Sequence, residues 1–425
     1  MSYIIEYINY LLSLQVRNSH KFSLLYDLLV KTSKLVVKRK LLNLKKYSKL
    51  QLVDNIEDLK CSYELIYNFT NRINRINKPY LLNNNQKNII ELNGSVPNID
   101  IYLLKDIKIQ AKSTSLIKNN MIYNHYFKKM EIFHDFKNPI NQVLSSFKTK
   151  LVNLYFKKNE AIKNEYCIHL LSEHSSNYYH FMFEILPKFI IISDLVNKNE
   201  KLTSITFIVL LDENCPHQFV EILKYFSTIN YEIKFISKHT LFTCNKLLFC
   251  TDLWTSLDNT KFISDIINDF FVDKYALELI KNKSKLEKVE PFRKVYFQRK
   301  NTQARYLSNT KELEDVLNKL DFEFVLPEKL SFQEQIDLMN ECKVIIGVSG
   351  AVFSNILFMQ KNTNAIIFSP NTIATNYYVF QSMADVANVK LTHVLTKNDF
   401  HDNIHTNSSI DINEVFSLLN KLENE

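Results

Sequence analysis

The chain has very little glycine. Only three glycines occur in 425 residues, and two of them, Gly347 and Gly350, stand within one short stretch. Glycine is required where the backbone takes a positive φ or must approach a ligand closely. Because glycine is so rare in this chain, the two glycines within residues 347–350 predict a turn with a binding role.

Several common signatures are also missing. The six cysteines form no C-x-x-C pair, which predicts free thiols in a reducing compartment and neither a zinc site nor a disulfide framework. There is no apolar run of about 18 residues and no signal-peptide pattern at the N-terminus. We therefore expect a cytoplasmic protein.

No phosphate-binding P-loop, G-x-G-x-x-G fingerprint, G-x-S-x-G elbow or D-x-D triplet occurs, so neither a cofactor nor a metal is expected.

The composition is that of a globular protein with a basic balance, 46% hydrophobic and with a net charge of +8. Eight Lys or Arg residues and no acid lie between positions 28 and 53. A basic amphipathic helix there would make peripheral contact with an anionic membrane, and the alternative is a solvated face whose leucines pack on the protein. No nucleic-acid module is apparent, so no nucleic-acid partner is expected.

The hydrophobic pattern predicts an α/β protein with an N-terminal helical extension. Apolar strands and amphipathic helices alternate in two successive units, which is typical of parallel sheets covered by helices. Two such units make a two-lobed molecule with a cleft between the lobes. The predicted domains are a basic helical extension (1–82), a first α/β domain (83–285) and a second α/β domain (286–425). Capping-box spacing predicts helix starts at Asn309 with Glu312 and at Ser331 with Glu334.

Residues 344–359 (VIIGVSGAVFSNILFM) predict a buried strand, a glycine turn and an apolar helix beginning near Ala351. Such a helix start directs unpaired backbone N–H groups and the positive end of the dipole toward one point, which suits a phosphate. An ordinary strand-to-helix turn is the alternative.

Two further stretches contain groups suited to chemistry. In residues 177–187 (NYYHFMFEILP), His180 and Glu184 are four apart and share one helix face, so the carboxylate can orient an imidazole that serves as a general base. The alternative is a helix-start histidine bonded to backbone, with Glu184 in an unrelated ion pair. Arg299 ends a predicted strand and Arg305 follows in a loop; two guanidinium groups there can hold one anion, although loop arginines are usually solvated.

Together these three stretches, with residues 330–336 (LSFQEQI) leading into the glycine turn, resemble glycosyltransferase family 61 over roughly residues 99–368. The resemblance implies an inverting glycosyltransferase of the GT-B type, with two Rossmann-like lobes facing a cleft. It implies a nucleotide sugar as donor substrate and an oligosaccharide or lipid-linked glycan as acceptor. Bacterial relatives serve capsule, lipopolysaccharide or other surface-glycan synthesis, which implies a site at the inner face of the plasma membrane.

Carried over by residue, the resemblance assigns catalysis to His180 with Glu184 in the acceptor-side lobe. It assigns the donor diphosphate to Arg299, Arg305, Gly347, Ser349, Gly350 and Ala351, with support from Glu334, Gln335 and Asn355. The chain departs from the family at Ser349, where a histidine is usual, and at Val352, where a third glycine often follows. A serine can bind phosphate but cannot act as a base, so a non-catalytic nucleotide- or glycan-binding subunit of an assembly complex is the alternative. Acidic residues of the first lobe remain competitors for the base, and a basic membrane- or nucleic-acid-binding protein is a third class.

Overall fold

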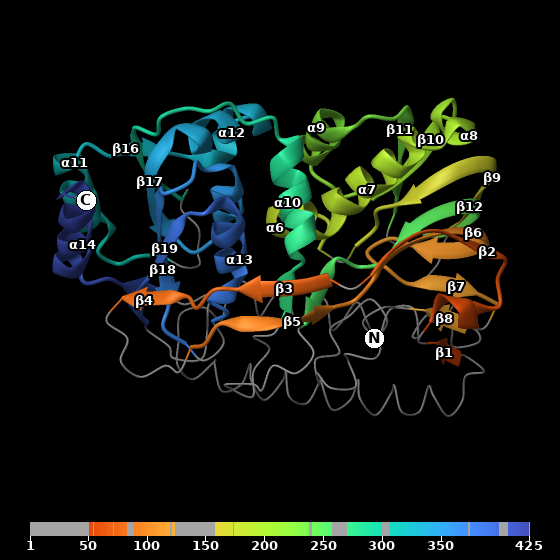
Figure 1. Cartoon of the computed structure of the whole chain (residues 1–425), viewed down its shortest axis with the longest axis horizontal. Helices are drawn as coiled ribbons and strands as arrows, with labels where there is room; N and C mark the ends of the chain where they lie inside the picture. Colours follow the sequence, from red (N-terminus) through yellow and green to blue (C-terminus); the bar gives the residue numbers. More distant parts are fainter. Residues whose placement is uncertain are drawn as a thin grey trace.

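The fold is a mixed α/β arrangement built on two separate sheets (Figure 1). A computed structural model describes residues 51–53, 55–70, 72–82, 89–119, 121–123, 158–172, 174–237, 240–256, 270–299, 306–372, 375–398 and 407–424. The predicted α/β class with parallel sheets is confirmed.

The first sheet has nine strands and a parallel half. Its order is β1 (Gln51–Val53), β8 (Met121–Tyr123), β7 (Leu116–Lys118), β6 (Ile99–Gln110), β12 (Thr240–Cys250), β9 (Lys158–His169), β10 (Phe207–Asp212) and β11 (Tyr231–Ile236), with β2 (Tyr63–Phe69) pairing on β6. The last four strands in this order run parallel, whereas β6 is antiparallel to β12. The helical elements of this half are α6 (Tyr178–His180), the π-helix η2 (Phe181–Ile185), α7 (Leu186–Asn197), α8 (Glu200–Thr203) and α9 (His217–Phe226).

The second sheet is almost entirely parallel. Its order is β16 (Glu323–Val325), β15 (Arg293–Phe297), β17 (Cys342–Val348), β18 (Asn364–Pro370), β19 (Lys390–Asn398) and β20 (Ser408–Ser409), with β4 (Tyr80–Leu82) parallel to β19. Only β20 is antiparallel to its neighbour. Its helices are α11 (Thr310–Lys319), η3 (Pro327–Lys329), α12 (Phe332–Glu341), the 3₁₀ helix η4 (Ala351–Phe358), α13 (Tyr378–Ala387) and α14 (Ile412–Asn424).

The remaining elements are short. They are the strand pairs β3 (Arg72–Ile76) with β5 (Leu92–Val96) and β13 (Trp254–Ser256) with β14 (Phe270–Val272), the short helix η1 (Ile56–Leu59) and α10 (Lys274–Lys283). In Figure 1, α10 stands between the helices of the two sheets. Residues 270–272 form β14, and α10 begins at Lys274 because Asp273 caps it.

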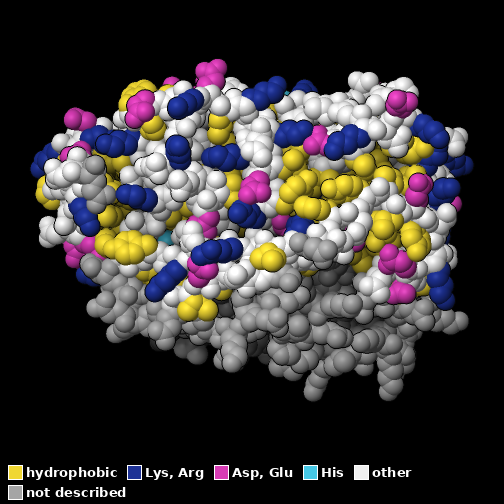
Figure 2. Space-filling model, viewed as in Figure 1, with side chains coloured by type: hydrophobic (Ala, Val, Ile, Leu, Met, Phe, Trp, Pro, Cys, Tyr) yellow, Lys and Arg dark blue, Asp and Glu magenta, His cyan; other side chains and the backbone are white. Residues whose placement is uncertain are grey.

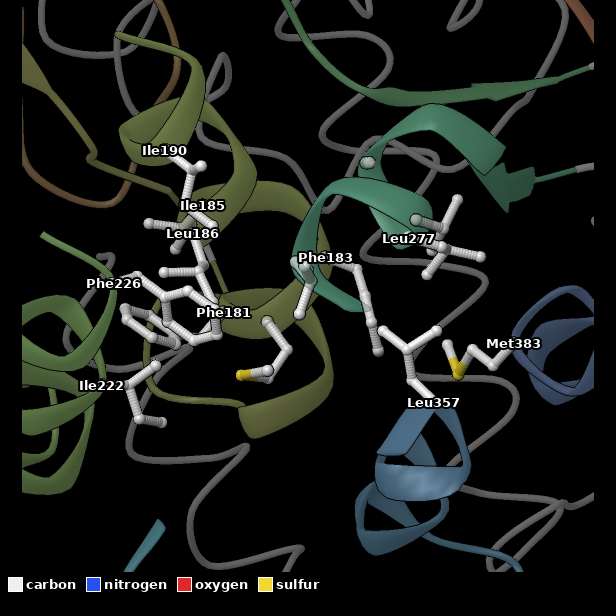
Figure 3. Close-up of a cluster of buried hydrophobic side chains, with 14 of the residues drawn as sticks. Phe181, Phe183, Ile185, Leu186, Ile190, Ile222, Phe226, Leu277, Leu357 and Met383 are labelled. Carbon is white, nitrogen blue, oxygen red and sulfur yellow. The ribbon is translucent and has the colours of Figure 1, made fainter. Parts of the chain in front are cut away.

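The two halves share one hydrophobic core. Phe181, Phe183 and Leu186 from the first half lie in the same buried cluster as Leu357 and Met383 from the second. In Figure 3 Phe183 points toward Leu357, with Leu277 of α10 and Met383 nearby. Such continuous burial of apolar surface fixes the two halves against each other.

The predicted helical extension is wrong over its described part. Residues 1–50, which include most of the basic stretch, lie outside the described residues, as does the polar run 83–88. Residues 51–82 form four strands and one short 3₁₀ helix. β2 joins the first sheet and β4 the second, because backbone pairing with a distant strand outweighs a weak local helical pattern.

All six cysteines are free thiols, as predicted. Among the described helices, none combines the length and hydropathy that crossing a bilayer requires. On the face seen in Figure 2, Lys and Arg side chains are scattered among acidic and neutral ones, and hydrophobic side chains gather in the right-hand half.

Candidate functional site

The residues singled out in the sequence follow the carboxyl ends of parallel strands, where ligands bind in open α/β sheets. β9 leads through residues 170–177 into α6, which carries His180. In the second sheet β15 leads to Arg299, and its neighbour β17 leads to Gly350. The helix α6 packs against η4, which brings the two halves of the candidate site together.

His180 and Glu184 form the predicted pair. Nδ1 of His180 lies 2.5 Å from Oε1 of Glu184. A carboxylate only accepts, so Nδ1 donates the proton and Nε2 is left with its lone pair, which is the tautomer a general base needs. The imidazole is half-buried and the glutamate buried. The helix start is fixed by Asn177, whose side chain accepts from the N–H groups of Tyr179 and His180.

The helix widens immediately after His180 into the π-helix η2. π-Helical turns are rare and occur mostly at functional sites. This one begins directly after the histidine and contains Glu184, and its residues Phe181 to Ile185 are all buried. Their burial holds the turn in an otherwise unfavourable geometry.

A second histidine, which the spacing argument did not select, stacks on the first. The rings of His174 and His180 have centroids 4.5 Å apart and are tilted by 30°. Burial, and then the nearby His180, lower the pKa of His174. The loop that carries His174 is anchored by Asp212, which accepts hydrogen bonds from the backbone N–H groups of Ser172 (3.1 Å) and Lys112 (2.5 Å).

Below Glu184 lies a small hollow that sequence reasoning also missed. Its polar lining includes Thr114, Ser172, Glu184, Lys188 and Asp252. Lys188 donates to Asp252 in a buried ion pair. The four-residue spacing of Glu184 and Lys188 was visible in the sequence. The pairing of Lys188 with Asp252, which follows β12, was not.

Arg299 lies directly against Gly350. A Cβ placed on Gly350 would come within 2.9 Å of Nη2 of Arg299. Among the described residues, no carboxylate lies within salt-bridge distance of this guanidinium, and the surrounding protein lowers its pKa by desolvation, partly offset by Glu328. A cation held without a carboxylate partner suits an incoming anion. Arg305 lies outside the described residues.

The glycines are explained by close approach and not by a positive φ. Gly350 is extended, with φ −175° and ψ 171°, and neither described glycine of this turn has a positive φ. A Cβ on Gly347 would meet Phe297, at 3.3 Å from both its Cβ and its carbonyl oxygen. The turn is therefore tight because strand β15 and Arg299 press against it.

The structure adds two details to the expected turn. The element after it is a 3₁₀ helix, not an α-helix, although its first turn still leaves leading N–H groups without helical acceptors. The N–H of Ser349 donates to the carbonyl of Phe368 at 3.0 Å, so this amide is engaged with β18. Ala351 begins the helix immediately after Gly350.

The three supporting residues are occupied by contacts within the protein. Glu334 completes the predicted capping box by accepting from the N–H of Ser331 at 2.7 Å. Asn355 donates to Gln335 at 2.9 Å and accepts from the hydroxyl of Tyr178 at 2.7 Å. Their described side-chain bonds thus tie structural elements together. In the described part of the chain, no group of three or more His, Cys, Asp or Glu is arranged to hold a metal ion.

Comparison with known proteins identifies the region that contains this site. The family model Glycosyltransferase 61 matches residues 178–366, a segment that begins two residues before His180 and includes the glycine turn. A search of the curated proteins finds no match. Residues 178–366 are therefore similar to glycosyltransferase family 61.

Proposed function

We propose that the protein is a metal-independent, inverting glycosyltransferase that moves a sugar from a nucleotide-diphosphate sugar to a glycan hydroxyl. The observation that carries this proposal is the His180–Glu184 pair, whose Nε2 is left as an acceptor on a helix packed against η4. A histidine paired with a carboxylate can supply the base that an inverting displacement requires.

In the proposed step, Nε2 of His180 takes the proton of the acceptor hydroxyl. The hydroxyl oxygen forms a bond to the anomeric carbon while the bond from that carbon to the diphosphate oxygen breaks. The electron pair leaves with the nucleoside diphosphate, and Glu184 stabilises the imidazolium that forms. Configuration at the anomeric carbon inverts because attack and departure occur on opposite faces.

The leaving diphosphate gains negative charge, and Arg299 is the described cation nearest the glycine turn. We assign it to that charge, with Arg305 as a second candidate cation and the leading N–H groups of η4 as further donors. Because the N–H of Ser349 already donates to the carbonyl of Phe368, we assign only the hydroxyl of Ser349 to the diphosphate.

The setting of the reaction follows from the resemblance and belongs to the same proposal. The two parallel sheets support two Rossmann-like lobes of the GT-B type, with the donor on the second. The acceptor is an oligosaccharide or lipid-linked glycan of a bacterial surface polysaccharide, made on the cytoplasmic face of the membrane. The basic residues between 28 and 53 would supply peripheral contact with that membrane.

The base is tested by His180→Ala, measured as sugar transfer at saturating substrates. We expect turnover to fall by about two to four orders of magnitude. His217→Ala is a matched control, because His217 is an exposed histidine on α9 that faces Glu221 four residues later, with Nδ1 to Oε1 at 3.7 Å. Near-normal turnover in folded His180→Ala would show that another residue is the base.

The donor site is tested by calorimetry with UDP, CDP and GDP. Arg299→Ala and Arg305→Ala should each weaken binding of the preferred nucleotide by about 1.5 to 3 kcal/mol. Arg75→Ala is the control, since Arg75 is exposed and pairs with Glu91. Absence of nucleotide binding by the wild type would refute the donor site. Loss of transfer in EDTA with recovery in Mn²⁺ would refute metal independence.

The departure at Ser349 supports a second candidate, a non-catalytic nucleotide- or glycan-binding subunit of a polysaccharide assembly complex. Incubation with nucleotide sugars separates the two functions. An enzyme releases the nucleoside diphosphate in the presence of acceptor, whereas a binding subunit holds the nucleotide sugar without releasing it.

A further inference from the structure

The two halves of the candidate site come from different sheets, so a specific contact must fix their separation. His180 belongs to α6, a helix of only three residues. The glycine turn lies at the end of β17, before η4. This short helix is the first turn of a continuous helical segment that runs through η2 into α7, and its contacts with η4 hold that turn against the second half.

A chain of hydrogen bonds makes that connection. The hydroxyl of Tyr178 donates to Oδ1 of Asn355 at 2.7 Å, and Nδ2 of Asn355 donates to Oε1 of Gln335 at 2.9 Å. Nε2 of Gln335 then donates to the carbonyl of Leu330 at 3.1 Å. The donors all point the same way, from α6 through η4 to the start of α12, so both amides are oriented without ambiguity.

The inner part of this relay is buried. Asn355 is 1% exposed, and Tyr178 is half-buried. Burial raises the pKa of Tyr178, so its hydroxyl keeps the proton it donates. A buried acceptor that loses its donor has no water to replace it, which makes the Tyr178–Asn355 bond selective for one placement of α6 on η4.

Aromatic packing surrounds the same junction. The ring of Tyr179 lies edge-on to Phe380, with centroids 6.3 Å apart, and Phe380 contacts Phe353 of η4 at 5.9 Å. Apolar packing tolerates small sliding, whereas a hydrogen bond does not. The hydrogen-bond relay therefore fixes the position of α6 on η4, while the aromatic rings keep the two elements in contact.

We propose that Tyr178 and Asn355 are positioning residues that set the distance between the His180 imidazole and the donor turn. This inference rests on the proposed function. Tyr178 precedes His180 by two residues, and Asn355 follows Gly350 by five. Their bond thus joins the base to the donor site through short stretches of backbone, and a displacement of about 1 Å at a reacting group is enough to lower a rate by about a hundredfold.

Tyr178→Phe removes the hydroxyl and keeps the ring. We expect turnover at saturating donor and acceptor to fall by about 10- to 100-fold, while the Kd for the nucleoside diphosphate, measured by calorimetry, stays within about twofold. Tyr225→Phe is the matched control, because Tyr225 donates a 2.7 Å hydrogen bond to the carbonyl of Ser284 away from this junction. That variant should keep wild-type turnover.

A double-variant cycle separates positioning from general destabilisation. If Tyr178 acts by placing His180, then Tyr178→Phe should change the residual rate of His180→Ala by less than about twofold. If the fold-losses in turnover of the two single variants multiplied in the double variant, the inference would be overturned. Wild-type turnover in Tyr178→Phe would also overturn it. Failure of the proposed function is distinct, since it appears as normal turnover in His180→Ala alone or as no nucleotide binding.

If Tyr178→Phe does not fold, Gln335→Leu tests the outer end of the relay. Gln335 is only half-buried, and its loss leaves the Tyr178–Asn355 bond in place while freeing the Asn355 amide. Turnover should fall by about 2- to 10-fold with an unchanged nucleotide Kd. Wild-type turnover in this variant would refute the role of the relay.

Discussion

At the scale of single residues, the two glycines of the turn have different structural roles. Gly347 makes room for the backbone and side chain of Phe297 on the neighbouring strand, and Gly350 makes room for the end of the Arg299 side chain. A strand cannot move aside as an arginine tip can. The same substitution should therefore affect stability at one glycine and nucleotide binding at the other.

We predict that Gly350→Ala folds normally but binds the nucleoside diphosphate about 10-fold more weakly, because the new methyl displaces the Arg299 guanidinium. Gly347→Ala should instead lower the free energy of unfolding by about 1 to 3 kcal/mol through overpacking against Phe297. Calorimetry and urea denaturation of both variants check this. Equal nucleotide affinity in Gly350→Ala and wild type would contradict it.

Residue spacing predicted some of these contacts and not others. The four-residue separation of His180 and Glu184 was sufficient to place them together, as the 2.5 Å contact confirms, although their roles remain predictions. Spacing could not show that Asn355 bonds to Tyr178, which is 177 residues distant in the chain. Nor could it show that the Ser349 amide is taken by Phe368, since a strand's partner depends on the whole sheet.

At the scale of elements, the two predicted capping boxes had different outcomes. Ser331 and Glu334 form theirs, because nothing else competes for the serine. Asn309 makes no side-chain cap; its amide instead donates to the carbonyl of Ile410 and accepts from the Ile410 N–H. The predicted helix start at Asn309 is confirmed, but the cap bond is absent because a distant segment supplies a better pair of partners than the local backbone does.

The far end of η4 is held by a lysine. Nζ of Lys281 on α10 donates to the carbonyls of Leu357 at 3.0 Å and Met359 at 3.3 Å. Burial without a carboxylate partner lowers the pKa of Lys281 from 10.5 to about 8. The folded protein therefore carries the cost of a desolvated charge below pH 8 and loses that cost as the ammonium deprotonates.

The sign of the pH effect follows from proton binding. Between pH 8 and about 10.5 the unfolded chain holds this proton and the folded chain does not, so the free energy of unfolding rises with pH. Relative to Lys281→Met, the wild type should gain up to about 1.4 kcal/mol per pH unit in that window. Urea denaturation at pH 7.5, 8.5 and 9.5 measures this. Lys288→Met, at an exposed position, should show no such pH-dependent difference, and parallel pH curves for wild type and Lys281→Met would refute the prediction.

At the scale of the whole molecule, the N-terminal strands join the two sheets. β2 pairs with β6, β4 pairs with β19, and between them Arg72 of β3 forms a buried ion pair with Asp273, the N-cap of α10. Local sequence pattern could not reveal this, because each strand is defined by a partner far along the chain. The alternating units of the two parallel sheets were predictable, since their strands and helices follow one another directly.

Each sheet also buries one neutral histidine. His169 ends β9 and lies against Phe249, with ring centroids 5.4 Å apart; His393 on β19 shares a 2.8 Å hydrogen bond between its Nδ1 and the hydroxyl of Ser369. In each ring Nε2 is buried without a hydrogen-bond partner. Burial lowers the pKa of His169 to about 3 and that of His393 to about 4.

Both histidines should make the molecule sensitive to acid. Below pH 6.5 the unfolded chain binds two protons that the folded chain does not bind until about pH 4 at His393 and about pH 3 at His169, so the free energy of unfolding falls with decreasing pH. Between pH 6.5 and 5 each histidine contributes a slope approaching roughly 1.4 kcal/mol per pH unit. His169→Phe and His393→Leu should each reduce the slope by the contribution of one histidine. Both variants should also lose stability at pH 7. Urea denaturation from pH 7 to 5 measures the slope, with exposed His217→Phe as control. An unchanged slope in both buried variants would mean that other groups control acid unfolding; a change in only one would assign it to that sheet.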